Sequence, residues 1–249
     1  MAHTIDSEAL EADSAAAGSE GKRAYMRRMF SEIAPRYDLL NRLLSLGIDR
    51  RWRTIALRRL AWDRAPEGVF LDLCAGTLDV GAQLSRLGGF RGRILGADFA
   101  EPMLRAGVGK APVATLAPVV ADALALPVRE AAFDGAIVAF GIRNVARLDA
   151  GLREVHRVLR PGARFVILEF STPRLPLVRA AYLFYFHRVL PLIGRLVSGH
   201  RTAYTYLPRS VAHFPETETL AAAMTAAGFR DVRWEPLTFG IAAIHVGTK

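Results

Sequence analysis

The sequence predicts an α/β fold built on an open, mostly parallel sheet of seven strands, with an antiparallel strand at its C-terminal end. The first observation behind this prediction is that short apolar runs alternate with helical stretches between about residues 69 and 170. The second is a helical stretch near the C-terminus followed by two short strands, which a closing hairpin at the sheet edge would explain. The third is size, because 249 residues, of which 51% are hydrophobic, suffice for one full-sized core.

Five apolar runs are predicted to be strands buried on both faces, because each is short and bounded by Gly, Pro or Asp. They are Val69–Leu73, Arg93–Asp98, Pro118–Ala121, Gly135–Phe140 and Arg164–Leu168.

Helical stretches separate these strands, for example Asp149 to Leu159, which ends at the Pro161-Gly162 turn. After them we expect one more helix and two strands. These are Glu216 to Ala227, Val232 to Pro236 and Ala242 to Gly247.

Two basic segments fall outside this alternation. Residues 21–64 hold 12 Lys plus Arg against 4 Asp plus Glu, and residues 174–209 hold 6 Arg and no acid, within a net charge of +9. Leu175 to Val197 is strongly apolar but interrupted by Arg and His. A membrane-spanning helix needs about 20 residues with few charges. This segment therefore fits a basic amphipathic element over a pocket or on a bilayer surface better than a membrane-spanning helix. The positive charge of the two segments would attract any polyanion, whether anionic lipid or nucleic acid.

The first 20 residues differ from the rest of the chain. They contain five acidic residues, no Lys or Arg and little beyond Ala and Ser, so we expect residues 1–20 to form a disordered acidic tail. They lack the features of a signal peptide. Residues 21–249 are then predicted to form a single domain, with a helical cap over about 21–64 and an insert over about 174–212. Cys74 is the only cysteine, which excludes an internal disulfide and fits a reducing cytosol.

Polar residues follow three of the predicted strands. Asp72 and Gly76 belong to a small turn that leads into a helix, where a ligand can approach the backbone closely. Asp98 ends the second strand, where a carboxylate can accept hydrogen bonds from both ribose hydroxyls of an adenosine. Asp122 and Ala123 follow the third strand, beside the place of an adenine ring. Carboxyl ends of strands are where open α/β sheets bind ligands, so we predict a nucleoside-type cofactor site.

The turn after the first strand lacks the G-x-G-x-x-G pattern, which argues against a nicotinamide or flavin dinucleotide. An acidic strand end before a short turn instead suits a cationic amino acid headgroup and a sulfonium. The alternative is that Asp72 and Asp98 only cap strand ends.

From about Tyr25 to Lys249 the chain resembles the ubiquinone/menaquinone biosynthesis C-methyltransferases, a family of class I methyltransferases. Three stretches carry the resemblance. The first is Tyr37-Asp38-Leu39-Leu40-Asn41, with Ser45 and Trp52. The second is Phe140-Gly141-Ile142-Arg143-Asn144-Val145, with Arg157-Val158-Leu159-Arg160-Pro161-Gly162 and Leu168-Glu169-Phe170-Ser171. The third is Tyr204-Thr205-Tyr206-Leu207-Pro208-Arg209-Ser210, with Phe214-Pro215.

The resemblance implies a Rossmann-like class I methyltransferase fold and S-adenosyl-L-methionine as the methyl donor. It places the cofactor contacts on Thr77, Asp98, Asp122 and Ala123. The implied acceptor is a ring carbon of demethylmenaquinol, and the alternative within the family is the polyprenyl benzoquinol of ubiquinone synthesis. The chain departs from the family's common residues at a few positions, which are Asp49, Leu78, Ala139 and Ala163.

Arg143 and Asn144 follow the fourth strand, so we expect them to face the transferred methyl group. Arg143 would stabilise a developing phenolate, and Asn144 or a water would relay the proton. Alternatively, Arg143 pairs with an acid and only fixes its loop.

Four further residues are candidates for binding the acceptor. Tyr37 and Asn41 belong to the N-terminal motif, and Tyr204 and Tyr206 alternate in the third stretch. They would line an apolar quinol channel, or else pack the helices and the core.

The partners that we expect are the prenylated quinol and an anionic membrane surface at the inner face of the cytoplasmic membrane; a homodimer is left open. A nucleic-acid methyltransferase is the distant alternative, but no flipped-base motif, RNA-binding module or paired cysteines accompany the basic charge. A non-catalytic cofactor-binding scaffold is the other alternative.

His187 and His213 lack partners at ligand spacing, so we expect no metal, and Cys74 is expected to be a packing residue.

Overall fold

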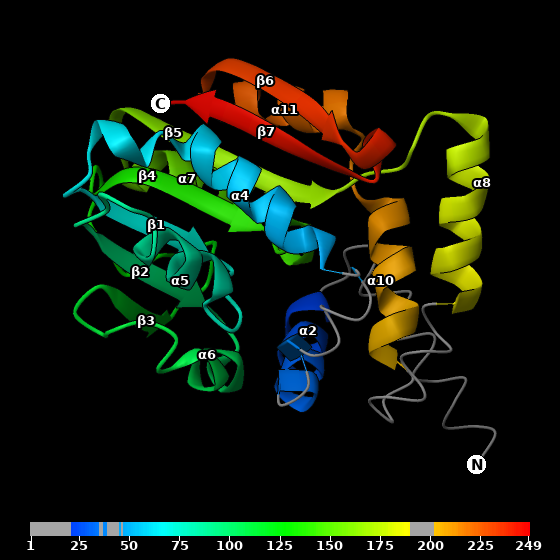
Figure 1. Ribbon diagram of the computed structural model, residues 1–249, viewed down its shortest axis with the longest axis horizontal. Coiled ribbons are helices and arrows are strands. Elements are labelled where there is room, and N and C mark those ends of the chain that lie inside the picture. The colour runs from blue at the N-terminus through cyan, green and yellow to red at the C-terminus, as the bar shows by residue number, and fades with distance from the viewer. Residues whose placement is uncertain (1–20, 35–36, 39–44, 46, 190–201) are drawn as a thin grey trace.

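The computed structural model describes residues 21–34, 37–38, 45, 47–189 and 202–249. Its centre is a seven-stranded sheet with the strand order β3-β2-β1-β4-β5-β7-β6 (Figure 1). The strands are β1 (Val69–Leu73), β2 (Arg93–Asp98), β3 (Leu116–Val120), β4 (Phe133–Ala139), β5 (Leu159–Phe170), β6 (Arg230–Leu237) and β7 (Ala242–Thr248). The predicted acidic tail lies outside the described residues.

The directions of the strands confirm the predicted fold class. β1 to β5 pair in parallel, whereas β7 runs antiparallel to both of its neighbours, β5 and β6. The central strand β1 is Val-Phe-Leu-Asp-Leu, and its last four residues are buried. Such a continuous apolar run is what a strand covered on both faces requires.

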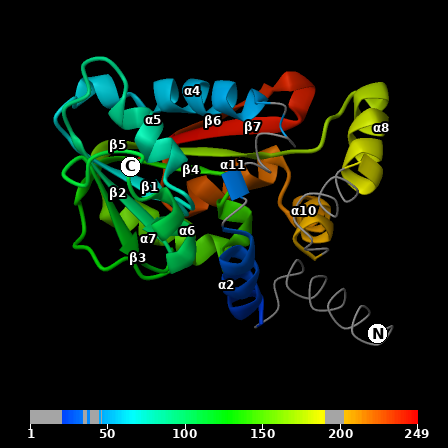
Figure 2. The same ribbon diagram turned by 60° about the horizontal axis from the view of Figure 1, so that its bottom comes forward.

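Helices cover both faces of the sheet (Figures 1 and 2). One face packs against α4 and α5 through a cluster that includes Trp52, Leu57 and Leu84. The other face packs against α7 and α11 through Leu152 and Met224. The helices are α2 (Lys22–Ile33), α4 (Ile48–Leu60), α5 (Asp79–Ser85), α6 (Glu101–Gly107), α7 (Leu148–Val158), α8 (Pro176–Phe184), α10 (Thr202–His213) and α11 (Thr217–Ala226).

Four strands, β3, β4, β5 and β6, begin earlier than the sequence pattern predicts. β3 starts at Leu116 and includes Pro118, which an edge strand tolerates because one side of its backbone has no neighbour. β5 starts at Leu159, and its pairing with β4 jumps to Arg164, so the Pro161-Gly162 turn bulges out of the ladder. The bulge is anchored by the N–H of Gly162, which donates to the carbonyl of Lys249 at 2.8 Å.

The two predicted additions to the sheet domain differ in their placement. Within the cap, α4 packs directly on the sheet, whereas α2 lies beyond the carboxyl ends of the strands (Figure 1). Within the insert, α8 and α10 stand on the same side as α2 (Figures 1 and 2). In the part of the chain that the structure describes, no helix has both the length and the apolar character needed to cross a membrane.

Candidate active site

The carboxylate of Asp98 organises the cofactor side of the site. It ends β2 and is 7% exposed. Its Oδ2 accepts the N–H of Gly76 at 2.9 Å, and its Oδ1 accepts the N–H of Ala100 at 2.8 Å. Burial raises the pKa of Asp98, although these backbone donors oppose the shift. The carboxylate thus joins the turn after β1 to the turn after β2.

The turn after β1 has an unusual backbone. Cys74, Gly76 and Leu78 all have positive φ angles, of 52°, 52° and 63°. The turn packs against the one after β4, where a Cβ added to Gly141 would overlap the Cβ of Cys74. Glycine at position 141 therefore allows the two strand-end turns to touch.

A narrow cavity of about 60 Å³ lies over these strand ends. Asp98 and Asp122 supply its carboxylates, and Met26, Phe30 and Tyr37 cover it from the N-terminal side. Its strand-end lining also includes Gly76, Phe99, Ala123, Phe140 and Asn144. Carboxylates for hydroxyl and amino groups, with apolar side chains for a flat base, fit S-adenosyl-L-methionine.

Two of the predicted cofactor residues lie behind this cavity rather than in its lining. Asp72 is 1% exposed, and its Oδ2 accepts the N–H of Gly81 in the first turn of α5 at 2.9 Å. Burial raises the pKa of Asp72 to about 7. Thr77 is also buried, and its hydroxyl donates to Asp38 Oδ1 at 2.6 Å. The alternative considered for Asp72 was a strand-end cap, whereas the contact observed here is with the backbone of α5.

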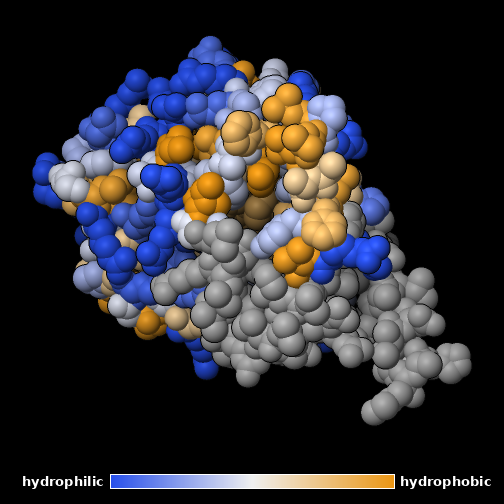
Figure 3. Space-filling view, turned by 45° about the vertical axis from the view of Figure 1, so that its right-hand side comes forward, coloured by the Kyte–Doolittle hydropathy of each residue, from blue (hydrophilic) through white to orange (hydrophobic). Residues whose placement is uncertain are grey.

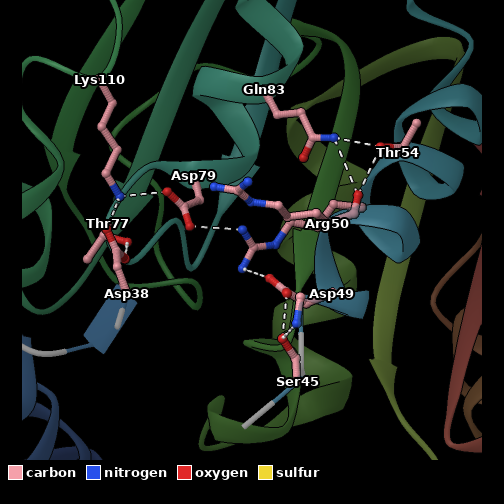
Figure 4. Close-up of polar contacts among 11 residues, drawn as sticks. Asp38, Ser45, Asp49, Arg50, Thr54, Thr77, Asp79, Gln83 and Lys110 are labelled. Atoms are coloured by element: carbon pink, nitrogen blue, oxygen red, sulfur yellow. Dashed lines mark hydrogen bonds and ion pairs between the residues drawn. The ribbon is translucent and has the colours of Figure 1, made fainter. Parts of the chain in front are cut away.

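A chain of alternating charges ties the N-terminal segment to the cofactor turn (Figure 4). Lys110 Nζ lies 2.5 Å from Asp38 Oδ2 and 2.6 Å from Asp79 Oδ1. Arg53 contacts Asp79 at 2.9 Å and Asp49 at 3.0 Å. We call Asp38, Lys110, Asp79, Arg53 and Asp49 the ion-pair chain. None of these contacts was predicted from the sequence; Asp49 and Arg53 are neighbours on α4, but the other partners are far apart along the chain.

A second, much larger cavity adjoins the first. It measures about 660 Å³, within the usual range of small-molecule sites. Figure 3 shows apolar side chains gathered around a recess on this side of the molecule. Its lining is mainly aromatic and aliphatic and includes Met29, Ile33, Trp52, Phe170, Val178, Ala181, Tyr182, Tyr185, Phe186, Tyr206 and Ile241. The two cavities share four lining residues, which are Phe30, Tyr37, Ala139 and Phe140.

Arg143 lines the large cavity and also pairs with a buried acid. Its Nη1 donates to Glu169 Oε1 at 2.7 Å and to the carbonyl of Phe140 at 2.5 Å. The guanidinium carbon lies 5.6 Å from the centroid of the Phe170 ring. Glu169 is 2% exposed, and burial raises its pKa although Arg143 opposes the shift. The geometry therefore contains both roles considered for Arg143, the ion pair and the exposure to the cavity.

Asn144, the next residue, lines the small cavity instead. Its Oδ1 accepts a hydrogen bond from the hydroxyl of Tyr206 at 3.1 Å. Burial raises the pKa of Tyr206 to about 12, so this hydroxyl stays protonated and remains a donor. Buried Lys22 of α2 holds the same loop, since its Nζ donates to the carbonyl of Arg143 at 2.9 Å.

The remaining predicted acceptor contacts divide into two groups. Tyr37 and Tyr206 line the large cavity. Asn41 and the side chain of Tyr204 lie outside the described part of the chain. Tyr182 is a lining residue that no sequence motif singled out.

Several solved structures with a similar fold are S-adenosylmethionine-dependent methyltransferases. A SAM-dependent methyltransferase from Thermotoga maritima superposes with a TM-score of 0.62 at 19% identity, covering 89% of this chain and 99% of that one. A Haemonchus contortus phosphoethanolamine N-methyltransferase in complex with S-adenosyl-L-methionine superposes with a TM-score of 0.54 at 14% identity, covering 73% and 48%. These likenesses show the class I methyltransferase fold, and the sequence of residues 18–249 makes the protein an S-adenosyl-L-methionine-dependent methyltransferase.

Sequence comparison identifies the family. Residues 18–249 match the model of the ubiE/COQ5 methyltransferase family, and the chain belongs to that family. It is 52% identical to the demethylmenaquinone methyltransferase of Thermus thermophilus, over 89% of this chain and 100% of that protein. It is 48% identical to the ubiquinone/menaquinone biosynthesis C-methyltransferase UbiE of Geobacter sulfurreducens, over 90% and 88%.

Proposed function

We propose that the enzyme transfers a methyl group from S-adenosyl-L-methionine to a ring carbon of demethylmenaquinol, giving menaquinol. The observation that carries this proposal is the junction of the two cavities at Phe140, with Arg143 on the apolar side of it. The names of the relatives from Thermus thermophilus and Deinococcus radiodurans, 52% and 47% identical, support demethylmenaquinol as the acceptor. Methylation of a polyprenyl benzoquinol is the alternative, because relatives named for both quinones are 43–48% identical.

The cofactor residues take three roles in this proposal. Asp98 accepts hydrogen bonds from the ribose hydroxyls, using the carboxylate lone pairs that the N–H groups of Gly76 and Ala100 do not occupy. Asp122 and Ala123 border the adenine. Asp72 and Thr77 hold the turn in shape from behind, through Gly81 and Asp38.

The bound cofactor supplies an electrophilic methyl group on a sulfonium. A ring hydroxyl gives its proton to a water, and Arg143 stabilises the oxyanion that remains, which makes the adjacent ring carbon nucleophilic. That carbon forms the new C–C bond as the methyl–sulfur bond breaks, and the electron pair remains on sulfur. The ring carbon then loses its own proton to a water held by Asn144, which restores aromaticity. Phe140 and Tyr37 exclude bulk water from the junction.

The acceptor's prenyl tail suggests peripheral contact with an anionic bilayer. Leu177 and Phe184 of α8 are 85% and 65% exposed, and they lie seven residues apart on one helical face. Arg179 and Arg188 are exposed on the same segment, and Phe239 is 72% exposed. Exposed apolar side chains among arginines fit the interface of an anionic membrane.

The direct test of the function is an in vitro assay with labelled S-adenosyl-L-methionine and two acceptors in parallel, reduced demethylmenaquinone and the polyprenyl benzoquinol. Labelled menaquinol is the expected product, and methylation of neither acceptor would refute the proposal.

Arg143→Lys keeps a positive charge beside Glu169 but loses the guanidinium geometry, so kcat should fall at least about tenfold with cofactor affinity retained. Retained kcat would instead support a purely structural Arg143. Asp98→Ala should weaken cofactor binding without unfolding the protein.

The membrane contact is tested separately by flotation with vesicles containing phosphatidylglycerol. Replacing both Leu177 and Phe184 with Ser should lower the bound fraction several-fold. Val113→Ser is the matched control, since Val113 is 73% exposed near the opposite edge of the sheet. Equal binding by both variants would count against α8 as the contact. Binding that collapses with salt and requires RNA would instead revive a nucleic-acid substrate.

A further inference from the structure

The hydroxyl of Tyr182 is buried without a hydrogen-bond partner among the described residues. Tyr182 belongs to α8 and is 6% exposed. Its ring packs on Phe186, with 4.2 Å between centroids and an interplanar angle of 33°. The residue lines the 660 Å³ cavity that also receives Arg143. Burial raises the pKa of this phenol well above its ordinary value, so it remains a proton donor under all working conditions.

A buried hydroxyl normally has a partner, because desolvation without one is unfavourable. Tyr206 in the same cavity wall follows this rule, since its hydroxyl donates to Asn144. Tyr182 differs in that the residue lines the cavity while its hydroxyl is closed to solvent and has no partner among the described residues, so a ligand that displaces a neighbouring side chain could accept its hydrogen bond. Unsatisfied polar groups in a native protein recur at functional positions.

We propose that Tyr182 binds the acceptor by donating a hydrogen bond to one of its two ring oxygens. This inference rests on the proposed function, because it concerns a 1,4-dioxygenated aromatic acceptor in the large cavity. Such a ring carries oxygens on opposite sides. Arg143 binds the oxygen beside the methylated carbon, and Tyr182 donates a hydrogen bond to the other oxygen.

This assignment gives α8 a second role besides its apolar exposed face. Val178, Ala181 and Tyr185 of the same segment line the cavity with Tyr182. α8 therefore recognises the acceptor, whereas the strand ends recognise the cofactor. Replacement of the cavity-lining residues of α8 should change acceptor preference without changing the cofactor.

The test is Tyr182→Phe, which removes the hydroxyl and keeps the ring. We expect KM for reduced demethylmenaquinone to rise about five- to tenfold, with kcat and cofactor affinity changed less than about twofold. The thermal midpoint should stay the same or rise, because an unsatisfied hydroxyl has been removed. Tyr25→Phe is the matched control, since Tyr25 is buried at 7% exposure but absent from the cavity lining, and its KM should equal that of the wild type.

A naphthol with one ring oxygen instead of two gives the decisive comparison. The wild type and Tyr182→Phe should bind this analogue equally in calorimetric titrations, whereas the wild type should bind the two-oxygen acceptor more tightly. An unchanged KM with a lowered thermal midpoint would overturn the proposal, since the hydroxyl would then be structural. If the wild type methylates neither quinol, the proposed function fails, but the two titrations still decide whether Tyr182 binds a ring oxygen.

Discussion

Lys110 holds Asp38 beside the cofactor turn, with 2.5 Å between its Nζ and Asp38 Oδ2. The same ammonium contacts Asp79 at the start of α5, so two carboxylates from distant segments share one cation. Burial alone would raise the pKa of Asp79, but Lys110 and Arg53 together lower it. Because Tyr37 directly precedes Asp38, this contact sets the position of a residue that lines both cavities.

Lys110→Met should therefore loosen the cover over the cofactor cavity. The substitution removes two ion pairs and leaves Asp38 and Asp79 facing each other without their shared cation. These groups are partly exposed, so we expect a modest effect, a rise of about 3- to 10-fold in the dissociation constant of S-adenosyl-L-methionine by calorimetry.

Adding Asp38→Asn to Lys110→Met should recover part of that loss, because it removes one of the repelling carboxylates. Arg91→Met is the control, since it breaks an ion pair with Glu67 whose side chains are 63% and 73% exposed. A double variant that binds more weakly than Lys110→Met would contradict repulsion as the cause.

Asp72→Asn should reduce the pH dependence of stability. The pKa of Asp72 in the folded protein is about 7, raised by burial above the ordinary value of 3.8. The folded state therefore binds a proton that the unfolded state has released, and stability from this group is lost as pH rises from about 4 to about 7. The loss amounts to at most about 4 kcal/mol for the wild type. Urea unfolding at pH 4.5, 6 and 8 should show that the free energy of unfolding changes less with pH in the variant than in the wild type. An equal change in both proteins would exclude titration of Asp72 as the cause.

Gly141→Ala should distort the contact between the two strand-end turns. The added methyl group would overlap the Cβ of Cys74, and overpacking of this kind costs about 1–3 kcal/mol. Adding Cys74→Gly should restore most of the stability, because it removes the overlapping atom and suits the φ angle of 52° at that position. The measurement is the thermal midpoint of Gly141→Ala and of the double variant. If the double variant is no more stable than Gly141→Ala, the overlap with Cys74 is not the source of the strain.

Tyr206→Phe should affect turnover through Asn144. The variant keeps the ring packing against Tyr25, 5.9 Å between centroids, but removes the donor to Asn144 Oδ1. We expect kcat to fall about 3- to 10-fold with unchanged cofactor affinity, since the amide loses one orienting hydrogen bond. Stopped-time assays at saturating acceptor would measure this, and a wild-type kcat would show that the amide is held by other contacts.

Features that depend on local patterns were predictable from the sequence. The strands of the parallel sheet are short apolar runs, and Asp98 could be placed because it ends one of them. Arg143 and Asn144 were placed after β4 for the same reason, although their division between two cavities depends on one short turn, Ile142–Asn144.

Features that depend on distant partners were not predictable. Asp38 and Lys110 are 72 residues apart, and neither belongs to a pattern that indicates the other. The direction of the Asp72 side chain, toward Gly81 rather than the cavity, depends on how α5 packs beside β1. Tyr182 resembles any other apolar helix residue in sequence, and only its missing partner in three dimensions distinguishes it.

The strand order has a consequence for synthesis on the ribosome. β7 follows β6 in the chain but lies between β5 and β6 in the sheet. β6 therefore has no place to dock until β7 has emerged, and until then β5 presents an open edge with Phe165, Val166 and Ile167. An unpaired apolar edge invites association between nascent chains. Translation pauses between β5 and β7 should thus lower the soluble yield more than equal pauses between β1 and β4.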